Sequence, residues 1–299
     1  MGASTEPTSS DAPTRAALTS VVVVSHDSGD WLHACVNSVL AQDAELELIV
    51  VDNASRDGAL DRLPSDTRLT LIRNRDNRGF GPACNQGATL ARGAQLLFLN
   101  PDCELPPGAI ARLHEMTAGD TQLAIVGAQL TNADGSPQAA ARRQTPTPLR
   151  AFRRALGLGG DGVEMPAVAV ASATTSSLES VEAVSGALMW MPRDAFSRLG
   201  GFDERYTLHC EDLDLCRRAL DAGFGVAVAS DLRVVHHKGR SSQARPLWVE
   251  WQKHRGMLRY FRKFDAAASP WWLRLLVPIG VWLRFPLAAA RAWAQSRQR

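Results

Sequence analysis

The stretch "AQLLFLNPDCELPPG", residues 94–108, joins an apolar strand to a carboxylate through a short turn. Its first residues read as a strand buried on both faces, and Asn100, Pro101 and Asp102 then lead into the turn. Ligands of open α/β sheets bind beyond the carboxyl ends of the strands. We therefore predict that Asp102 lies at the ligand-binding edge of a parallel sheet.

Strands and helices alternate along the first 130 residues. The strands are β-branched or leucine-rich runs, which is typical of strands that helices cover on both faces. The alternation predicts an α/β fold with a doubly wound, mostly parallel sheet. The predicted strands are 20–26, 46–53, 69–74, 94–100 and 123–130. The predicted helices between them are 31–40, 56–63, 81–93 (ended by Gly93) and 107–118.

The pattern is less regular beyond residue 130. The sequence "NADG" at 132–135 predicts a hairpin turn, and residues 157–177 have the low-complexity composition of a loop. Residues 181–204 read as structured again, and 211–223 as a helix. Two short strands complete this part, around 226–230 and 232–239.

The composition is that of a soluble globular protein, with 299 residues, 45% of them hydrophobic and 21% charged. Five cysteines without a CxxC pair predict reduced thiols in a cytosolic setting rather than disulfides or a zinc site. Residues 1–17 are rich in Ser, Thr, Pro and Ala and lack the apolar core of a signal peptide, so we predict a disordered leader.

Basic and aromatic residues gather in the last part of the chain. Residues 245–299 carry a net charge of +9 and six of the eight tryptophans, so the first 244 residues carry −7. Residues 271–294 are strongly apolar, but three arginines and two prolines argue against a transmembrane span. Helical spacing places Arg274, Arg284 and Arg291 within about 100° of arc, which predicts an amphipathic helix at a membrane surface. The alternative is a helical pair packed on the rest of the protein.

Polar side chains follow three of the predicted strands. Their positions are Ser25–Asp27, Asp52–Asn53 and Asn100–Asp102. Each could serve alone as a turn residue or helix cap, but in a parallel sheet all three would meet at one edge. Asp52 could accept hydrogen bonds from a nucleotide, and Asp102 could bind a divalent cation through its hard oxygen atoms.

Two glycines, Gly79 and Gly81, precede the helix predicted after the third strand. A dinucleotide-binding fingerprint would follow the first strand, so we interpret the glycines as a backbone turn that packs against a nucleotide. Arg78 and Asn85 would then face this ligand. A simple helix cap is the alternative interpretation.

Three acids open the last helix predicted before the tail. The helix dipole favours carboxylates there, so the acids alone do not indicate a site. Asp214 is placed to pair with Arg217 or Arg218. Glu211 and Asp212 remain for solvent or substrate, and only one of them can face a given site because adjacent helical residues point about 100° apart.

Two neighbouring histidines, His236 and His237, end the last predicted strand. Such a pair usually has one buried and one exposed imidazole. A neutral imidazole also suits a carboxylate at a Mn²⁺ or Zn²⁺ site. The chain has no HxxxH or HExxH motif, so the sequence does not indicate a zinc hydrolase.

Six stretches between residues 19 and 242 resemble, in this order, the motifs of family 2 glycosyltransferases with the GT-A fold, most of all the bacterial rhamnosyltransferase branch. The stretches are "VVVVSHDSGDWLHACVNSVLAQ", "IVVDNASRDG", "NRGFGPACNQG", "LFLNPDCELPPG", "VSGALMWMPRDAFSRLGGFDERYTLHCEDLDLCRRALDAGF" and "VVHHKGRSS". We therefore expect a GT-A domain over 18–242 and a membrane-proximal helical tail over 243–299.

The resemblance implies that a sugar, with rhamnose suggested by the branch, passes with inversion from a nucleotide-diphosphate donor to a hydroxyl of a glycan or polyprenyl-linked acceptor. It implies a role in cell-surface polysaccharide or lipopolysaccharide assembly, on the cytoplasmic face of the cell membrane. A carboxylate would accept the proton of the attacking hydroxyl. Asp212 would be this base, with Glu211 beside it.

The resemblance also implies a bound Mg²⁺ or Mn²⁺. Asn100-Pro101-Asp102 corresponds to the metal-binding DxD motif with Asn at its first position, so Asp102 would be the acidic ligand. His236 would be the imidazole ligand in preference to His237. The residues assigned to the nucleotide or donor are Ser25, Asp27, Asp52, Asn53, Arg78, Gly79, Asn85 and Asn100.

Two other classes of protein fit the residues less well. A nucleotidyltransferase of the same fold would have a loop rich in Gly and Lys after its first strand, and "SHDSGDW" is not such a loop. A nucleic-acid-binding protein could use the basic, aromatic tail. That interpretation leaves the acidic body without a role, so we expect no nucleic-acid partner.

Overall fold

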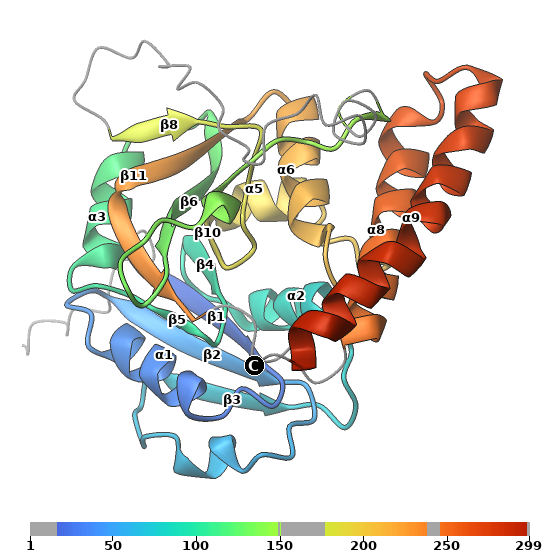
Figure 1. Cartoon of the computed structure of the whole chain (residues 1–299). Coiled ribbons are helices and arrows are strands. Elements are labelled where there is room, and N and C mark those ends of the chain that lie inside the picture. Colours follow the sequence, from blue (N-terminus) through green and yellow to red (C-terminus); the bar gives the residue numbers. More distant parts are fainter. Residues whose placement is uncertain (1–16, 149, 151–176, 238–245, 298–299) are drawn as a thin grey trace, which may run out of the picture.

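The computed structural model describes residues 17–148, 150, 177–237 and 246–297. Within them, nine strands form one sheet with helices on both faces, and two short strands form a separate ladder (Figure 1). The predicted leader and the predicted loop at 157–177 lie almost wholly outside the described residues.

The first half of the sheet is parallel, as predicted. Its strands are β1 (Thr19–Ser25), β2 (Leu46–Asp52), β3 (Leu69–Arg73) and β4 (Gln95–Leu99). β1 pairs with β2 on one side and with β4 on the other, and β2 pairs with β3. The register places Ser25 opposite Asp52, so β1 and β2 end at the same edge of the sheet.

Helices cover both faces because each central strand is apolar on both sides. The helices of the first half are α1 (Asp30–Leu40), the 3₁₀-helix η1 (Ala59–Arg62), α2 (Phe80–Leu90) and α3 (Ala109–Thr117). Val21 and Val23 of β1 belong to the core under α1 and α3, whereas Val22 and Val24 belong to the core under α2. Each fully buried Val contributes roughly 2 kcal/mol of burial free energy.

The second half of the sheet contains antiparallel strands, one of which lies near the centre of the sheet. Its strands are β5 (Cys103–Glu104), β6 (Leu123–Thr131), β8 (Leu178–Ser180), β10 (Leu188–Pro192) and β11 (Gly225–His236). The strand order is β3-β2-β1-β4-β10-β6-β11-β5, with β8 paired to β11. β10 runs antiparallel to β4 and β6, and β11 runs parallel to β6. The amino end of β10 therefore lies at the edge where the parallel strands end.

Further elements complete this half of the fold. They are η2 (Ala139–Ala141), β7 (Arg142–Arg143), β9 (Ala183–Val184), α5 (Arg193–Arg198) and α6 (Glu211–Asp221). β7 pairs with β9, so it is held beside the chain that leads into β10. The helix predicted at 211–223 is confirmed as α6.

Two predictions about element boundaries are wrong. β11 is a single strand of 12 residues rather than two short ones, because an irregularity between Ala229 and Arg233 interrupts its pairing with β6 without ending it. α2 ends at Leu90, so Gly93 does not cap it. A Cβ at Gly93 would lie 2.5 Å from the carbonyl oxygen of Leu18, so this glycine allows the chain to pass close to β1.

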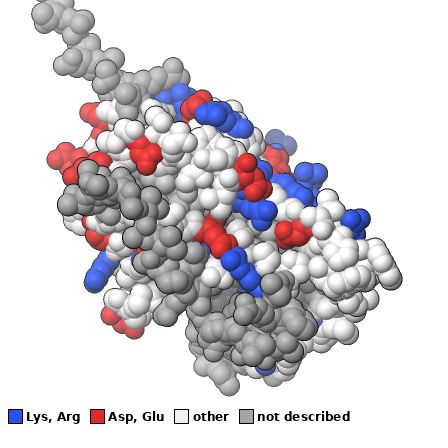
Figure 2. Space-filling model, turned by 90° about the horizontal axis from the view of Figure 1, so that it is seen from above, with Lys and Arg blue, Asp and Glu red and all other residues white. Residues whose placement is uncertain are grey.

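The last part of the chain forms a helical hairpin. It consists of α8 (Pro246–Tyr260), the π-helical turn η3 (Phe261–Asp265) and α9 (Trp271–Arg297). The hairpin stands beside the sheet at the right of Figure 1, and the corresponding side of Figure 2 is mostly white. Trp251 of α8 contacts Trp282 and Phe285 of α9, with ring centroids 4.5 and 5.6 Å apart. The chain therefore has the helical extension that the sequence predicts.

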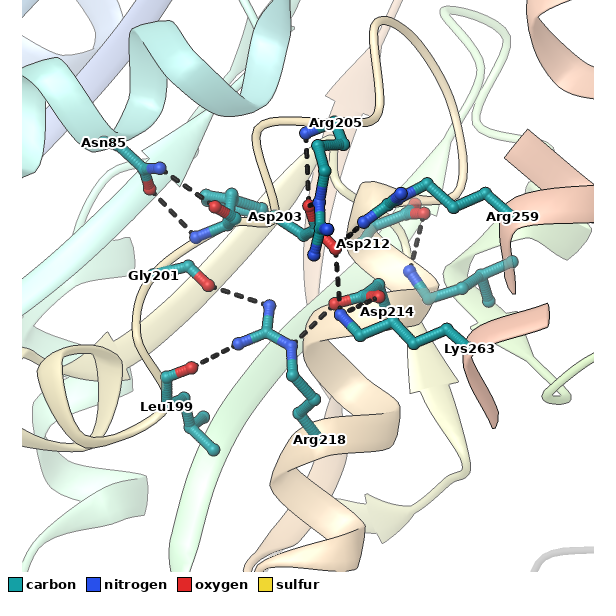
Figure 3. Close-up of polar contacts among 12 residues, drawn as sticks. Asn85, Leu199, Gly201, Asp203, Arg205, Asp212, Asp214, Arg218, Arg259 and Lys263 are labelled. Atoms are coloured by element: carbon teal, nitrogen blue, oxygen red, sulfur yellow. Dashed lines mark hydrogen bonds and ion pairs between the residues drawn. The ribbon is translucent and has the colours of Figure 1, made fainter. Parts of the chain in front are cut away.

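Charged residues bind this hairpin to α6 (Figure 3). Asp214 is fully buried and accepts hydrogen bonds of 2.6 Å from both Arg218 and Lys263. The predicted pairing of Asp214 with Arg218 is thus confirmed. Burial acts to raise the pKa of Asp203, but hydrogen bonds from Arg259 and Lys263 outweigh it and hold that pKa well below its ordinary value. Removing the hairpin would take Lys263 away from both carboxylates and Arg259 away from Asp203, which is costly for a buried charge.

Candidate active site

The ends of β1 and β2 meet at the predicted edge. Ser25, Asp52 and Asn53 are buried there, and the Asn53 N–H donates to the Ser25 carbonyl oxygen at 2.8 Å. The Asp52 carboxylate accepts hydrogen bonds from the Ser55 N–H at 3.2 and 3.3 Å and from its hydroxyl. The Asn53 side chain donates to the Gly79 carbonyl oxygen at 3.0 Å. The glycine turn therefore lies against the end of β2.

Three other residues assigned to the donor are more open to solvent. Asp27 is exposed, with φ 48°, and its carboxylate accepts a hydrogen bond from the Arg56 N–H at 2.7 Å. Arg78 is exposed directly before Gly79, and Asn100 is half-buried after β4. Their contacts with a donor stay predictions.

Gly79 and Asn85 connect α2 to the chain before α6. Gly79 has φ 92°, and a Cβ there would lie 2.8 Å from the Thr207 carbonyl oxygen, so only glycine allows this approach. The Asn85 side chain accepts a hydrogen bond from the Phe202 N–H and donates to the Phe202 carbonyl oxygen, both at 2.9 Å (Figure 3). The structure thus gives Asn85 a structural role in place of the predicted donor contact.

Asp102 and His236 face each other at the same edge. Asp102 Oδ1 lies 3.4 Å from His236 Nε2, and both side chains are about nine-tenths buried. The Gln138 amide donates to the His236 carbonyl oxygen at 2.8 Å, and its own oxygen lies 2.9 Å from Nδ1. Nδ1 therefore carries the proton, and Nε2 presents a lone pair to a carboxylate oxygen that is buried without a hydrogen-bond partner. Two acceptor atoms this close would suit a shared cation.

Neighbouring side chains narrow the set of possible metal ligands. The potential ligand atoms of Cys103, Asp102 and His236 lie within 4.8 Å of one another. Burial raises the pKa of Cys103 far above its ordinary value, so it stays a neutral thiol. The Nε2 atom of His237 lies 2.6 Å from Glu104 Oε1, and the imidazole ring stacks on Trp31. His237 therefore has other partners than a metal at Asp102. The remaining oxygen and imidazole ligands suit Mg²⁺ or Mn²⁺.

Asp212, in the first turn of α6, is held by groups from two other elements. It forms an ion pair with Arg143 of β7 and accepts a hydrogen bond from the Gly186 N–H at 3.0 Å. A Cβ on Gly186 would lie 3.3 Å from the Asp212 Cβ, so glycine leaves room for the carboxylate. Burial acts to lower the pKa of Arg143, but the charge of Asp212 raises it. The guanidinium thus fixes Asp212 through a charge-assisted contact.

Glu211 has the opposite environment. It is buried, and its Oε2 has no hydrogen-bond partner among the described residues. Burial, and then the neighbouring charge of Asp212, raises the pKa of Glu211 to about 8. Glu211 is therefore mostly neutral at pH 7, whereas Asp212 is the member of the pair that contacts Arg143.

The two halves of the site meet at the turn before β10. The Gly186 N–H of this turn donates to Asp212, and the Ala187 carbonyl oxygen accepts a hydrogen bond from the Asn100 N–H at 2.9 Å. Asn100 begins the turn that carries Asp102. The structure therefore brings the predicted metal ligands and the predicted acid pair to one edge of the sheet.

The chain that leads into α6 has a strained backbone. His209 and Cys210 are consecutive left-handed residues, with φ 67° and 71°. α8 packs on them through Gly256, where a Cβ would lie 3.0 Å from the His209 carbonyl oxygen. Burial, and then the charge of Lys253, lowers the pKa of His209 to about 4, and its Nε2 is buried without a hydrogen-bond partner among the described residues. A neutral imidazole thus lies three positions before Asp212.

Three residues of this site could not be identified from the sequence. Arg143 meets Asp212 across 69 positions of the chain, and its stretch "RRQTPTPLR" reads only as a basic loop. Gly186 and His209 lie in stretches that carry other motif residues. Only the pairing of β7 with β9 and the packing of α8 reveal their positions, and no local pattern encodes either.

The family model described as "Glycosyl transferase family 2" matches residues 20–172, slightly more than half of the chain. The chain belongs to this family. The match includes the strand ends that carry Asp52 and Asp102, whereas Asp212 and His236 lie beyond it. The enzyme is a glycosyltransferase, as predicted.

Individual relatives match this chain over more of its length than the family model does. The chain is 28% identical to the N-acetylglucosaminyl-diphospho-decaprenol L-rhamnosyltransferase of Mycobacterium tuberculosis over 302 residues, 93% of this chain and 95% of the relative. The low-salt glycan biosynthesis hexosyltransferase Agl10 of Haloferax volcanii is 22% identical over 73% of this chain and 67% of its own.

Solved structures show the same fold. The mannosyltransferase PcManGT of Pyrobaculum calidifontis, in complex with GDP-Man and Mn²⁺, has a TM-score of 0.55 at 20% identity and is matched over 96% of this chain and 77% of its own. GalNAc-T7 with UDP, GalNAc and Mn²⁺ has a TM-score of 0.56 at 19% identity, over 74% of this chain and 43% of its own. The enzyme has the predicted GT-A fold.

The raised pKa of Glu211 predicts a pH-dependent stability. Its folded pKa of about 8 lies above the ordinary 4.5, so its contribution is fully present below pH 4.5 and is lost as the pH rises toward 8. Glu211→Gln has no such proton to lose. In chemical denaturation, we expect the stability of the wild type relative to Glu211→Gln to fall between pH 5 and 8. Glu115→Gln, an exposed control, should keep the wild-type slope, and an equal slope for Glu211→Gln would contradict the assignment.

Proposed function

We propose that the enzyme transfers a sugar, with inversion, from a nucleotide-diphosphate donor to a hydroxyl of a glycan or lipid-linked acceptor in cell-surface polysaccharide assembly. One observation carries the proposal: the Asp102–His236 pair and the ion-paired Asp212 lie at one sheet edge, joined through the turn before β10. Through a bound cation, the Asp102–His236 pair would neutralise the charge of the donor diphosphate. Asp212 would accept the proton of the attacking hydroxyl.

Asp102 and His236 are the residues that would hold a divalent cation. The fit rests on their two facing acceptor atoms and on the buried Asp102 oxygen without a partner. A bound Mg²⁺ or Mn²⁺ would neutralise the negative charge that builds up on the leaving diphosphate. Ser25, Asp52 and Asn53, at the adjoining strand ends, are proposed to contact the nucleotide, with Asp27, Arg78, Gly79 and Asn100 around them.

Asp212 is the better base of the acid pair. Glu211 is protonated at neutral pH and cannot accept another proton, whereas Asp212 is held by Arg143 and the Gly186 N–H. A single charged carboxylate that takes the hydroxyl proton suits direct displacement, which inverts the anomeric carbon. The neutral side chain of Glu211 would lie beside Asp212 without adding a second negative charge to the site.

The sugar and the acceptor are proposed from the relatives. The printed name of the Mycobacterium tuberculosis relative gives an L-rhamnosyl group and a diphospho-decaprenol acceptor. An Escherichia coli relative, 30% identical over 28% of this chain, is named a glucosyltransferase that acts on a diphosphoundecaprenol. We propose a polyprenyl-diphosphate-linked acceptor and rhamnose as the first sugar to test.

We propose that the enzyme acts at the cytoplasmic face of a membrane. α9 is long and apolar enough to cross a membrane, by length and composition alone. One of its faces packs on α8, and the opposite face exposes Leu275, Leu276, Ile279, Leu283 and Leu287 to solvent. We propose that residues 18–242 form the catalytic domain and that α9 in the tail 243–299 rests on the lipid surface.

The donor assignment predicts metal-dependent cleavage. With a panel of nucleotide sugars, we expect the wild type to release nucleoside diphosphate from one member, and only with Mn²⁺ or Mg²⁺. Asp102→Ala should weaken donor binding in calorimetry with Mn²⁺ at least tenfold, and Asp120→Ala, which removes an exposed carboxylate, should not. Donor affinity that neither EDTA nor Asp102→Ala changes would exclude the proposed metal site.

The base assignment predicts a separate effect on turnover. Asp212→Asn keeps an oxygen for Arg143 and Gly186 but is too weakly basic to take the proton. We expect a loss of about 10²- to 10⁴-fold in kcat, with donor affinity within twofold of the wild type. Asp221→Asn, at the other end of α6, is the matched control. Turnover at the wild-type rate in Asp212→Asn would remove Asp212 from this role.

The lipid contact of α9 predicts vesicle binding. Leu283 is 74% exposed on the outer face of α9, so Leu283→Glu should lower partition onto anionic vesicles by roughly tenfold. Leu90→Glu, on α2, changes an exposed leucine elsewhere and should bind like the wild type. Point substitutions are used because truncation would remove Arg259 and Lys263 from their buried partners. Equal co-sedimentation of all three proteins would exclude the membrane contact.

A further inference from the structure

A cavity of about 460 Å³ lies between the α8–α9 hairpin and the chain at residues 205–208. It is outside the strand-end site described above. Among the described residues, its wall contains no acidic side chain but carries four arginines and two tryptophans: Arg205, Arg255, Arg259, Arg262, Trp251 and Trp282. Such a wall favours an anionic ligand with an apolar portion.

The positive charge of this cavity is not balanced within the described part of the chain. Arg205 and Arg259 share one carboxylate, that of Asp203. The side chains of Arg255 and Arg262 are exposed, and neither forms an ion pair or hydrogen bond with a described residue. Arg259 Nε is buried without an acceptor. Such an N–H donor is available to an oxygen acceptor, either of water or of a ligand.

The cavity also borders the candidate active site. Thr207, in its wall, packs against Gly79 at the donor edge. Gly256, also in the wall, packs against His209 and Cys210, directly before the acid pair. A molecule bound here would therefore lie on the opposite side of the loop from the donor turn and close to the start of α6.

The apolar outer face of the hairpin continues into the same cavity. Trp251 lines the cavity and is 43% exposed, and its ring contacts Trp282 of α9. Leu283, the next residue, belongs to the exposed face of α9. A hydrocarbon chain on that face could thus reach the arginines without crossing a polar surface.

We propose that this cavity binds the diphosphate of a polyprenyl-diphosphate-linked acceptor, with the polyprenyl chain along α9 and the acceptor sugar directed toward Asp212. The inference rests on the proposed function for its acceptor class. Arg255 and Arg262 are the phosphate-binding residues, and Arg259 supplies its free N–H. Two adjacent phosphates match several convergent guanidinium groups better than the single phosphate of a membrane lipid does.

The test measures binding of farnesyl diphosphate by calorimetry, in EDTA so that no metal can bridge it to the Asp102 edge. The variant is the double substitution Arg255→Ala and Arg262→Ala, both at exposed positions. The control is Arg62→Ala with Arg233→Ala, which removes the same charge from exposed positions elsewhere. Farnesol, inorganic pyrophosphate and phosphatidylglycerol vesicles serve as comparison ligands, and unfolding midpoints check that both variants are folded.

We expect the variant to bind farnesyl diphosphate at least tenfold more weakly, with the control within twofold of the wild type. Farnesol and pyrophosphate should each bind more weakly than farnesyl diphosphate, because each lacks one half of the ligand. Unchanged binding of farnesyl diphosphate by the folded variant would overturn the proposal. So would an equal loss of binding to phosphatidylglycerol vesicles, since the arginines would then be a general contact for anionic lipid.

Donor hydrolysis separates this inference from the proposed function. Release of nucleoside diphosphate in water needs no acceptor, so the Arg255/Arg262 variant should hydrolyse donor at the wild-type rate. If the wild type cleaves no nucleotide sugar while farnesyl diphosphate binding still depends on the arginines, the proposed function fails and the cavity assignment stands. If cleavage is normal and farnesyl diphosphate binding is insensitive to the arginines, the cavity assignment alone fails.

Discussion

The antiparallel insertion of β10 between β4 and β6 is the constraint on which the site depends. It turns the amino end of one strand toward the edge where the parallel strands end. The turn before β10 can therefore bind Asp212 through the Gly186 N–H. It also binds the turn that begins at Asn100, through the Ala187 carbonyl oxygen. A wholly parallel sheet would place that turn at the opposite edge, and the acid pair and the metal ligands would have no common support.

These carboxylates have similar intrinsic acidities, and their different electrostatic surroundings give them different roles. Glu211 is buried without a partner and keeps its proton, Asp212 is fixed by Arg143, and Asp102 faces an imidazole lone pair. Asp214, three residues after Glu211, binds Arg218 of α6 and Lys263 of η3. Three acids within one turn of a helix thus have three different roles, which their neighbours decide.

The sequence predicted what is local or repetitive. Apolar runs predicted the parallel strands, and the polar residues after them predicted that Ser25, Asp52 and Asp102 lie at one edge of the sheet. It failed where one residue meets another far along the chain. Asn85 binds the backbone of Phe202 rather than facing a ligand, and Arg143 reaches Asp212 only because β7 pairs with β9. Gly93 resembled a helix end, yet it is required by the proximity of Leu18.

The ion pairs of Asp203 and Asp214 would have a geometric consequence if α9 rests on a lipid surface, as proposed. They attach α8 and η3 to the chain around α6, so the hairpin is fixed beside the acid pair. With α9 on the bilayer, Asp212 would stand at a constant height above the headgroups. That height would select acceptors by their length. A hydroxyl on a sugar close to the lipid could reach the base, whereas a hydroxyl at the tip of a long glycan would extend past it.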